Sequence, residues 1–257
     1  MTVAIRPASD SFTPRQQAVL TAALVLLVEA GDGLKMDAVE ARSLGELFSA
    51  DYAGADPFPH IVLDDFLPAA LVGQVLANFP SGERSSDGVF NIGYGGEHKR
   101  QITPEDCNRF SRELFQFFNS RPVLQFLEGL TGIDGLLPDP YFTGGGFHEI
   151  TRGGRLGVHA DFRINEQLHL QRRLNLLIYL NPAWDDRWMG QLELWSRDMK
   201  QCARKVSPLL NRCVVFNTEA DTWHGYPDAL AVPDGLTRRS MALYYYSASR
   251  HVYNDTP

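Results

Sequence analysis

Hydrophobic positions divide the chain into a helical first half and a strand-rich second half. In residues 67–79, apolar side chains recur every three or four positions, which predicts an amphipathic helix. The same period predicts further helices over residues 14–30, 36–49, 105–119 and 121–130. Residues 60–63 form a short apolar run between turn residues and are predicted to be a strand.

The helical period disappears after residue 130. Short apolar runs then follow one another between turns, at residues 147–150, 156–159, 174–180, 191–195, 213–217 and 240–246. This spacing predicts an antiparallel sandwich or a small barrel rather than alternating strands and helices. We therefore expect an α+β chain in which N-terminal helices support a β-core.

Two segments are predicted to be irregular. Residues 51–59 are rich in turn-forming residues and indicate a linker, so we expect a helical N-terminal extension over 1–56 and the main domain over 57–257. The extension is either a packing element or an interaction element, and we favour packing. Residues 87–97 are glycine-rich and polar, which predicts a loop, and the segment 87–100 is either a lid or a plain surface loop.

Composition narrows the class of protein. The net charge is −7 and no dense Lys/Arg tract exists, so nucleic acid is not expected as a partner. The 3 cysteines form no C-x-x-C pair, which favours a reducing compartment. The longest apolar stretch, 18–28, is too short to span a bilayer, and the first residues lack the order of a secretory signal. We expect a cytoplasmic enzyme without a membrane partner.

A metal-binding pattern occurs in the strand-rich half. His159 and Asp161 are two residues apart, so on a strand they point to the same side. His224, which lies between later apolar runs, can supply a third ligand. Two imidazoles and one carboxylate leave three positions open, the arrangement of non-haem Fe(II) oxygenases. The H-x-D pair alone is a weak signal, since a structural His–Asp pair is common and a zinc hydrolase has the same ligand set.

Arg238 opens an apolar strand and is the second candidate of interest. A buried arginine needs an anionic partner, and a dicarboxylate co-substrate provides one that the guanidinium can hold with two hydrogen bonds. An exposed arginine at the strand end is the alternative, and the adjacent Arg239 makes it expected that one of the two faces solvent.

Several segments between residues 57 and 246 then carry a resemblance. They are GGGFHEITRGGRLGVHADF, RRLNLLIYLNPAW, NRCVVFNTEADTWHG and RRSMALYYYS, in this order. The order H-x-D, H and R resembles the iron(II)/2-oxoglutarate dioxygenases, in their prolyl-4-hydroxylase-like branch. The resemblance implies a double-stranded β-helix (a jelly roll of cupin type), with iron on His159, Asp161 and His224. It also implies that Arg238 and Tyr179 bind the distal carboxylate of 2-oxoglutarate, with Asn175 on the same wall.

The resemblance further implies an oxygenase that uses Fe(II), 2-oxoglutarate and O2. Such an enzyme hydroxylates an unactivated C–H bond and releases succinate and CO2. Asp161 is retained, which favours hydroxylation over halogenation, while desaturation and ring closure stay open. We expect a small molecule as the substrate, biosynthetic intermediates included. The alternatives are a prolyl or other amino-acid hydroxylase acting on a protein, and a non-catalytic jelly-roll binding protein. The sequence predicts no oligomeric state.

Substrate contacts are the weakest part of the sequence pattern. Arg155 shares the strand parity of His159, and Arg163 shares that of Asp161, so either can hold an anionic group. A solvated strand-end arginine is the favoured alternative for both. Tyr244 shares the inward parity of Arg238. Tyr141 stands where close relatives often have histidine, so it is expected at the mouth of the pocket.

Overall fold

The computed structural model describes residues 28–30, 33–82, 87–90 and 96–248. Its helices are α2 (Ala38–Leu47), α3 (Ser49–Ala53), α4 (Ala69–Ala77), α5 (Arg109–Phe118) and α6 (Arg121–Thr131), with short 3-10 turns at Pro104–Asp106 and Asp186–Trp188. Its strands are β1 (Val28–Ala30), β2 (Gly33–Lys35), β3 (His60–Leu63), β4 (Gly88–Phe90), β5 (Lys99–Ile102), β6 (Leu137–Pro138), β7 (Gly146–Ile150), β8 (Leu156–His159), β9 (Ile164–Asn165), β10 (Leu170–Tyr179), β11 (Leu192–Trp195), β12 (Cys202–Val206), β13 (Cys213–Asn217), β14 (His224–Tyr226) and β15 (Arg238–Ala248).

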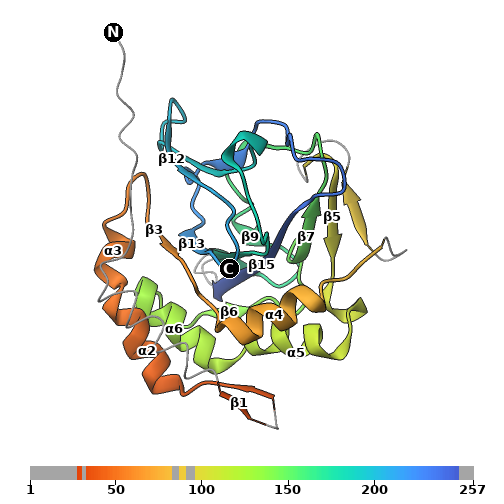
Figure 1. The fold of residues 1–257 in the computed structure, drawn as a ribbon. Coiled ribbons are helices and arrows are strands. Elements are labelled where there is room, and N and C mark those ends of the chain that lie inside the picture. Colours follow the sequence, from red (N-terminus) through yellow and green to blue (C-terminus); the bar gives the residue numbers. More distant parts are fainter. Residues whose placement is uncertain (1–27, 31–32, 83–86, 91–95, 249–257) are drawn as a thin grey trace.

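Two antiparallel sheets face each other and form the double-stranded β-helix. The larger sheet has the order β3-β13-β10-β15-β7-β5-β4, with β6 and β9 at its margins. The smaller sheet has the order β12-β11-β14-β8. In Figure 1 the helices gather below the larger sheet, and the smaller sheet lies on its other side. The space between the two sheets is therefore left to side chains from both.

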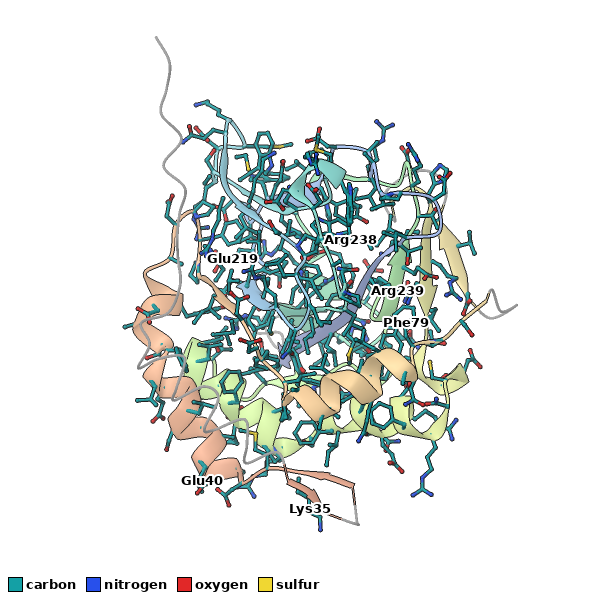
Figure 2. All side chains as sticks on the ribbon, viewed as in Figure 1. Lys35, Glu40, Phe79, Glu219, Arg238 and Arg239 are labelled. Atoms are coloured by element: carbon teal, nitrogen blue, oxygen red, sulfur yellow. The ribbon has the colours of Figure 1, made fainter. Side chains whose placement is uncertain are left out.

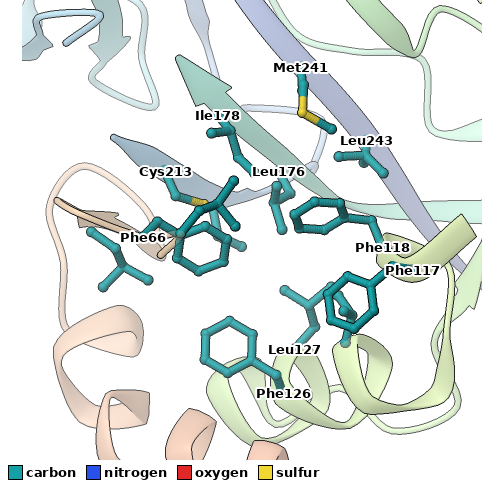
Figure 3. Packing of buried hydrophobic residues seen from close by; sticks show 14 of the residues in the cluster. Phe66, Phe117, Phe118, Phe126, Leu127, Leu176, Ile178, Cys213, Met241 and Leu243 are labelled. Atoms are coloured by element: carbon teal, nitrogen blue, oxygen red, sulfur yellow. The ribbon is translucent and has the colours of Figure 1, made fainter. Parts of the chain in front are cut away.

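The main apolar core lies between the larger sheet and the helices. Helices α5 and α6 present buried aromatic and aliphatic side chains, among them Phe117, Phe118 and Leu127, toward Leu176 on β10 and Leu243 on β15 (Figure 3). Helix α5 begins where the side chain of its N-cap asparagine accepts a hydrogen bond from a backbone amide of the first turn. This layer supports β10 and β15 from behind, and both strands carry site residues on their opposite face.

Helix α2 joins the same core through a close backbone contact with α6. A Cβ atom at Gly45 would lie 2.1 Å from the carbonyl oxygen of Phe126, and one at Gly129 would lie 2.3 Å from that of Arg42. Only glycine permits so close an approach of two helices. Buried residues of α2 and α3, including Leu44 and Tyr52, extend the core of the main domain. The boundary near residue 56 stays a prediction, but these two helices pack on the domain.

Most predicted elements are present at the expected places. The structure confirms the helices expected within 36–49, 67–79, 105–119 and 121–130, the strand at 60–63 and the six strands after residue 130. Of the helix predicted over 14–30, residues 14–27 lie outside the described residues, and the helix is wrong for 28–30, which pair with β2 as a strand. The loop prediction is wrong for 88–90, which form β4, and for 99–100, which begin β5. None of the described helices is long and apolar enough to cross a membrane.

Candidate active site

Three metal-ligand side chains converge at one end of the smaller sheet. His159 ends β8 and lies directly opposite His224, which begins the paired strand β14. Asp161 follows two residues after His159, where the strand has ended. One ligand atom from each of the three residues lies within 4.8 Å of the others, with the two imidazole rings 4.6 Å apart between centroids. The pairing of β8 with β14 therefore brings together residues that are far apart in the sequence.

Backbone hydrogen bonds orient both imidazoles for metal binding. Nδ1 of His159 lies 2.8 Å from the carbonyl oxygen of Gly157, and Nδ1 of His224 lies 3.0 Å from that of Thr222. A carbonyl only accepts, so each Nδ1 carries the proton and each Nε2 keeps its lone pair. Both Nε2 atoms face Asp161, at 3.7 Å and 3.5 Å from its carboxylate oxygens. Burial lowers the pKa of His224 to about 4, so this imidazole is neutral at physiological pH.

Asp161 is held in its ionised form by groups behind it. The side-chain amide of Asn175 donates a hydrogen bond of 2.7 Å to Oδ2 of Asp161, and Nη2 of Arg172 lies 3.2 Å from the same oxygen. Burial alone would raise the pKa of Asp161. The charge of Arg172, together with the hydrogen bond from Asn175, instead brings this pKa well below its ordinary value.

The donor set fits a divalent transition metal. One nitrogen atom from each of two imidazoles and one carboxylate oxygen lie within 4.8 Å of one another. This is the facial arrangement that leaves positions open on a six-coordinate Fe(II). Asn175 fixes the carboxylate by a direct hydrogen bond, as outer-shell partners of metal ligands commonly do.

Arg238 faces the same space from the larger sheet. Only 4% of its surface is exposed. Its Nε donates 2.8 Å to the carbonyl oxygen of Gly190, and its guanidinium packs over the rings of Tyr226 at 4.5 Å and Tyr179 at 5.0 Å. No carboxylate of the described residues lies within ion-pair distance of the Arg238 guanidinium. Arg238 and the Tyr179 hydroxyl, 3.4 Å from Nη2, thus offer donors to an anion from outside the protein.

Arg239 lies on the opposite face of β15. Its Nε donates 2.9 Å to Oε1 of Glu149, and its guanidinium packs 4.5 Å from the ring centroid of Phe79. Figure 2 shows Arg239 beside Phe79, whereas Arg238 lies in the space between the sheets. The strand alternation expected for this pair is therefore what the structure has.

One cavity of about 330 Å³ connects the metal ligands with Arg238. Its lining includes His159, Asp161, His224, Asn175 and Arg238. Apolar and aromatic side chains, among them Ile150, Leu177, Phe216, Tyr226 and Tyr244, cover much of the rest. Polar groups are thus concentrated around the metal position and at the arginine, which is the pattern of a small-molecule site.

Of the four substrate contacts expected from the sequence, one lines the cavity and three do not. Tyr244 lines the cavity, and its ring packs 3.6 Å from the Arg172 guanidinium carbon. Arg155 is exposed and lies 3.0 Å from a carboxylate oxygen of Glu97. Arg163 borders a separate surface groove, and Tyr141 is 57% exposed. Arg155, Arg163 and Tyr141 are not among the residues that line the cavity.

Two cations that the sequence did not single out line the cavity instead. Arg172 is 2% exposed, although strand parity from Asn175 would place Arg173 inside. A β-bulge between Arg172 and Leu174 shifts the register and turns Arg172 inward. Lys99 was missed because its segment resembled a glycine-rich loop, whereas it begins a strand next to β7. The only sequence signal for Arg172 was the pair of arginines before an apolar strand, and no signal for Lys99 was visible.

Comparison with known proteins finds a match to a family model. Residues 145–246 match the family model described as the 2OG-Fe(II) oxygenase superfamily, and this span includes all three metal-ligand candidates and Arg238. No protein among the curated sequences matches the chain.

Solved structures with similar folds share low sequence identity with the chain. A prolyl hydroxylase from Trichoplax adhaerens, in complex with a peptide of hypoxia inducible factor, has a TM-score of 0.52 and 17% identity, covering 81% of this chain and 91% of that one. A prolyl-4-hydroxylase from Pseudomonas putida has a TM-score of 0.51 and 19% identity, covering 79% and 99%. HygX from Streptomyces hygroscopicus, with nickel, 2-oxoglutarate and hygromycin B bound, has a TM-score of 0.51 and 11% identity, covering 79% and 86%. These likenesses concern the fold.

Proposed function

Since residues 145–246 match the 2OG-Fe(II) oxygenase superfamily, we propose that the chain hydroxylates an unactivated C–H bond of a small molecule at this site. The observation that carries the proposal is one cavity lined both by the three metal-ligand candidates, two histidines and an aspartate, and by the buried Arg238. Arg238 has no carboxylate partner among the described residues. With iron and 2-oxoglutarate bound, O2 would be the oxidant: one oxygen atom would enter succinate as 2-oxoglutarate loses CO2, and the other would enter the C–H bond of the substrate.

In this proposal His159, Asp161 and His224 hold the iron through two Nε2 atoms and a carboxylate oxygen. Support comes from the hydrogen bonds of both Nδ1 atoms, which fix the rings and their tautomer before any metal arrives. Asn175 positions the carboxylate by donating to its second oxygen. We assign Asn175 this positioning role in place of a direct contact with 2-oxoglutarate.

Arg238 and Tyr179 are proposed to bind the distal carboxylate of 2-oxoglutarate. Arg238 is prevented from turning away by its bond to the Gly190 carbonyl and by the two tyrosine rings around its guanidinium. The Tyr179 hydroxyl is fully buried, and burial raises its pKa, so it stays protonated and donates a hydrogen bond. An anchored, desolvated donor pair gains more from a carboxylate than one that must first be ordered.

The size of the cavity supports a small molecule as the substrate. Its volume of about 330 Å³ is at the lower end of the range in which proteins bind cofactors and metabolites. 2-Oxoglutarate occupies part of that space, so only a compact group of the substrate can reach the metal. Action on a residue of a protein is the alternative, and a side chain inserted from outside would have to enter the same cavity.

The test supplies both substrate classes separately. The protein is incubated in air with Fe(II), 2-oxoglutarate and either the small-molecule filtrate or the retained protein fraction of a cell extract. Succinate is followed by NMR, and products with one added oxygen are sought by mass spectrometry, with Asp161→Ala as the control. The proposal expects extra succinate and an oxygenated small molecule from the filtrate alone. Oxygenated peptides from the protein fraction alone would reassign the target to proteins. No succinate under any condition would contradict the oxygenase itself.

A further inference from the structure

The cavity contains more positive charge than the proposed iron and 2-oxoglutarate require. Lys99, Arg172 and Arg238 all line it, and Asp161 is the single carboxylate in the lining. With Fe(II), these three side chains carry five positive charges, against three negative charges on Asp161 and 2-oxoglutarate, so a surplus of positive charge remains. Arg172 is paired with Asp161 at 3.2 Å, and Arg238 is matched by the distal carboxylate in the proposed function. Lys99 is then the cation without a counterpart.

Lys99 has no partner among the described residues. No hydrogen bond or ion pair joins its ammonium group to any of them, and it makes a cation–π contact in which Nζ lies 5.5 Å from the centroid of the Phe90 ring. Its aliphatic stem lies beside Gly96, where a Cβ atom would be 3.7 Å from Cδ of Lys99. Burial, together with the charge of Arg238, lowers the pKa of Lys99 to about 8. Keeping an unpaired ammonium in such surroundings costs stability unless an anion arrives.

Lys99 and Arg238 occupy separate positions in the cavity. Lys99 lies opposite Ile150 on β7, and Ile150 lies opposite Arg238 on β15, so the three share a face and the two cations are two strands apart. Two strand spacings amount to about 10 Å. Arg238 packs over the ring of Tyr179 on β10, the strand on the side of β15 away from β5, and its Nε is held by the Gly190 carbonyl. A single carboxylate fixed on Arg238 therefore leaves Lys99 unmatched.

We propose that Lys99 forms a second anion-binding subsite, which holds a carboxylate or phosphate group of the substrate at the edge of the cavity formed by β4 and β5. This inference rests on the proposed function, in which Arg238 is already occupied by 2-oxoglutarate. The neighbouring Phe90, Ile150 and Leu156 are apolar, so the anionic group is attached to an apolar body. The substrate class is then an amphiphilic organic acid or phosphate ester.

The test uses benzoate and its neutral analogue benzamide as probes, because their shape is similar and only one is charged. Both are titrated calorimetrically into the metal-free protein and into protein loaded with Ni(II), which replaces Fe(II) without reacting with O2, and 2-oxoglutarate. The variants are Lys99→Met, which removes the charge, and Lys99→Arg, which keeps it. Lys200→Met is the matched control, since Lys200 is a surface lysine that pairs with Asp198 at 2.9 Å.

We expect the wild type and Lys200→Met to bind benzoate at least about tenfold more tightly than benzamide, the factor that 1.4 kcal/mol represents. Lys99→Met abolishes that preference, Lys99→Arg keeps it, and 2-oxoglutarate affinity changes less than about threefold. Equal binding of the two probes by the wild type, or a preference for benzoate that survives in Lys99→Met, overturns the subsite. A preference that disappears together with 2-oxoglutarate affinity in Lys99→Met also overturns it, because Lys99 would then bind the co-substrate. Failure of Ni(II) and 2-oxoglutarate to bind the wild type counts against the proposed function instead, and the metal-free titration, carried out in an Arg238→Met background that removes the other open cation, still decides on Lys99.

Discussion

Replacement of Arg238 by methionine gives the sharpest prediction about the co-substrate site. The change removes the guanidinium but keeps an unbranched apolar side chain of similar reach. Arg238 is 4% exposed and its position is fixed by the Gly190 carbonyl, so water cannot take over its role without rearrangement. Removing one partner of a buried, hydrogen-bonded charge pair costs about 2–5 kcal/mol. We therefore expect 2-oxoglutarate to bind roughly 30- to 4,000-fold more weakly.

The assay is calorimetric titration of 2-oxoglutarate into Ni(II)-loaded protein, with the metal affinity measured beforehand. Metal affinity should stay unchanged, because none of the Arg238 contacts is a metal-ligand candidate. Arg239→Met is the matched control, since Arg239 is the next residue and pairs with Glu149 on the other face of β15. It should alter 2-oxoglutarate affinity less than about threefold, because a partly exposed pair contributes little. A folded, metal-binding Arg238→Met protein with wild-type 2-oxoglutarate affinity would refute the assignment.

Three further predictions concern the supports of the site. Asn175→Leu should lower metal affinity about 10- to 100-fold, because the carboxylate ligand loses the hydrogen bond that orients it, and a metal titration that finds no change would remove Asn175 from this role. Gly190→Ala should weaken 2-oxoglutarate binding, because the φ of +78° at Gly190 disfavours a Cβ atom and that atom would lie 2.4 Å from a side-chain carbon of Leu230. Calorimetry checks this, with Gly235→Ala as the control, since Gly235 has a similar φ and open space around it. Gly129→Ala should force α2 away from α6 and so lower the free energy of unfolding by about 1–3 kcal/mol, measured by urea denaturation, without changing 2-oxoglutarate affinity. An unchanged urea midpoint would contradict the close helix contact.

The local hydrophobic pattern was sufficient to predict those helices and strands whose apolar positions all lie on the buried side of the element. Helices α4 to α6 and the strands after residue 130 have one apolar face or a short apolar run, and these signals depend on the segment alone. Strands β4 and β5 were missed because they flank a polar, glycine-rich segment, and only the pairing of β4 with β5 and of β5 with β7 makes them part of the sheet. Tertiary pairing of this kind leaves no mark in a local window.

The residues of the candidate site divide in the same way, into those predicted from the local sequence and those that depend on how the strands pair. His159 and Arg238 lie in strands and are placed as strand parity requires, whereas Asp161 lies just after the end of β8 and still faces the two histidines. Arg172 could not be found in this way, since a single β-bulge reverses the parity of its strand. Lys99 required knowledge of which strand lies two places from Arg238. Residue types and spacing thus predict the metal set, while the charge distribution around it depends on sheet register.

The most direct test of the central claim is the visible spectrum of the metal-free protein under argon, recorded after Fe(II) and again after 2-oxoglutarate is added. A weak charge-transfer band that needs both additions is the result we expect, since chelation through the keto oxygen and adjacent carboxylate produces it. Asp161→Ala should lose the band at every concentration, whereas Arg238→Met should recover it at high 2-oxoglutarate. A protein that gives no band, and retains zinc tightly in place of iron, would contradict the oxygenase assignment of this site.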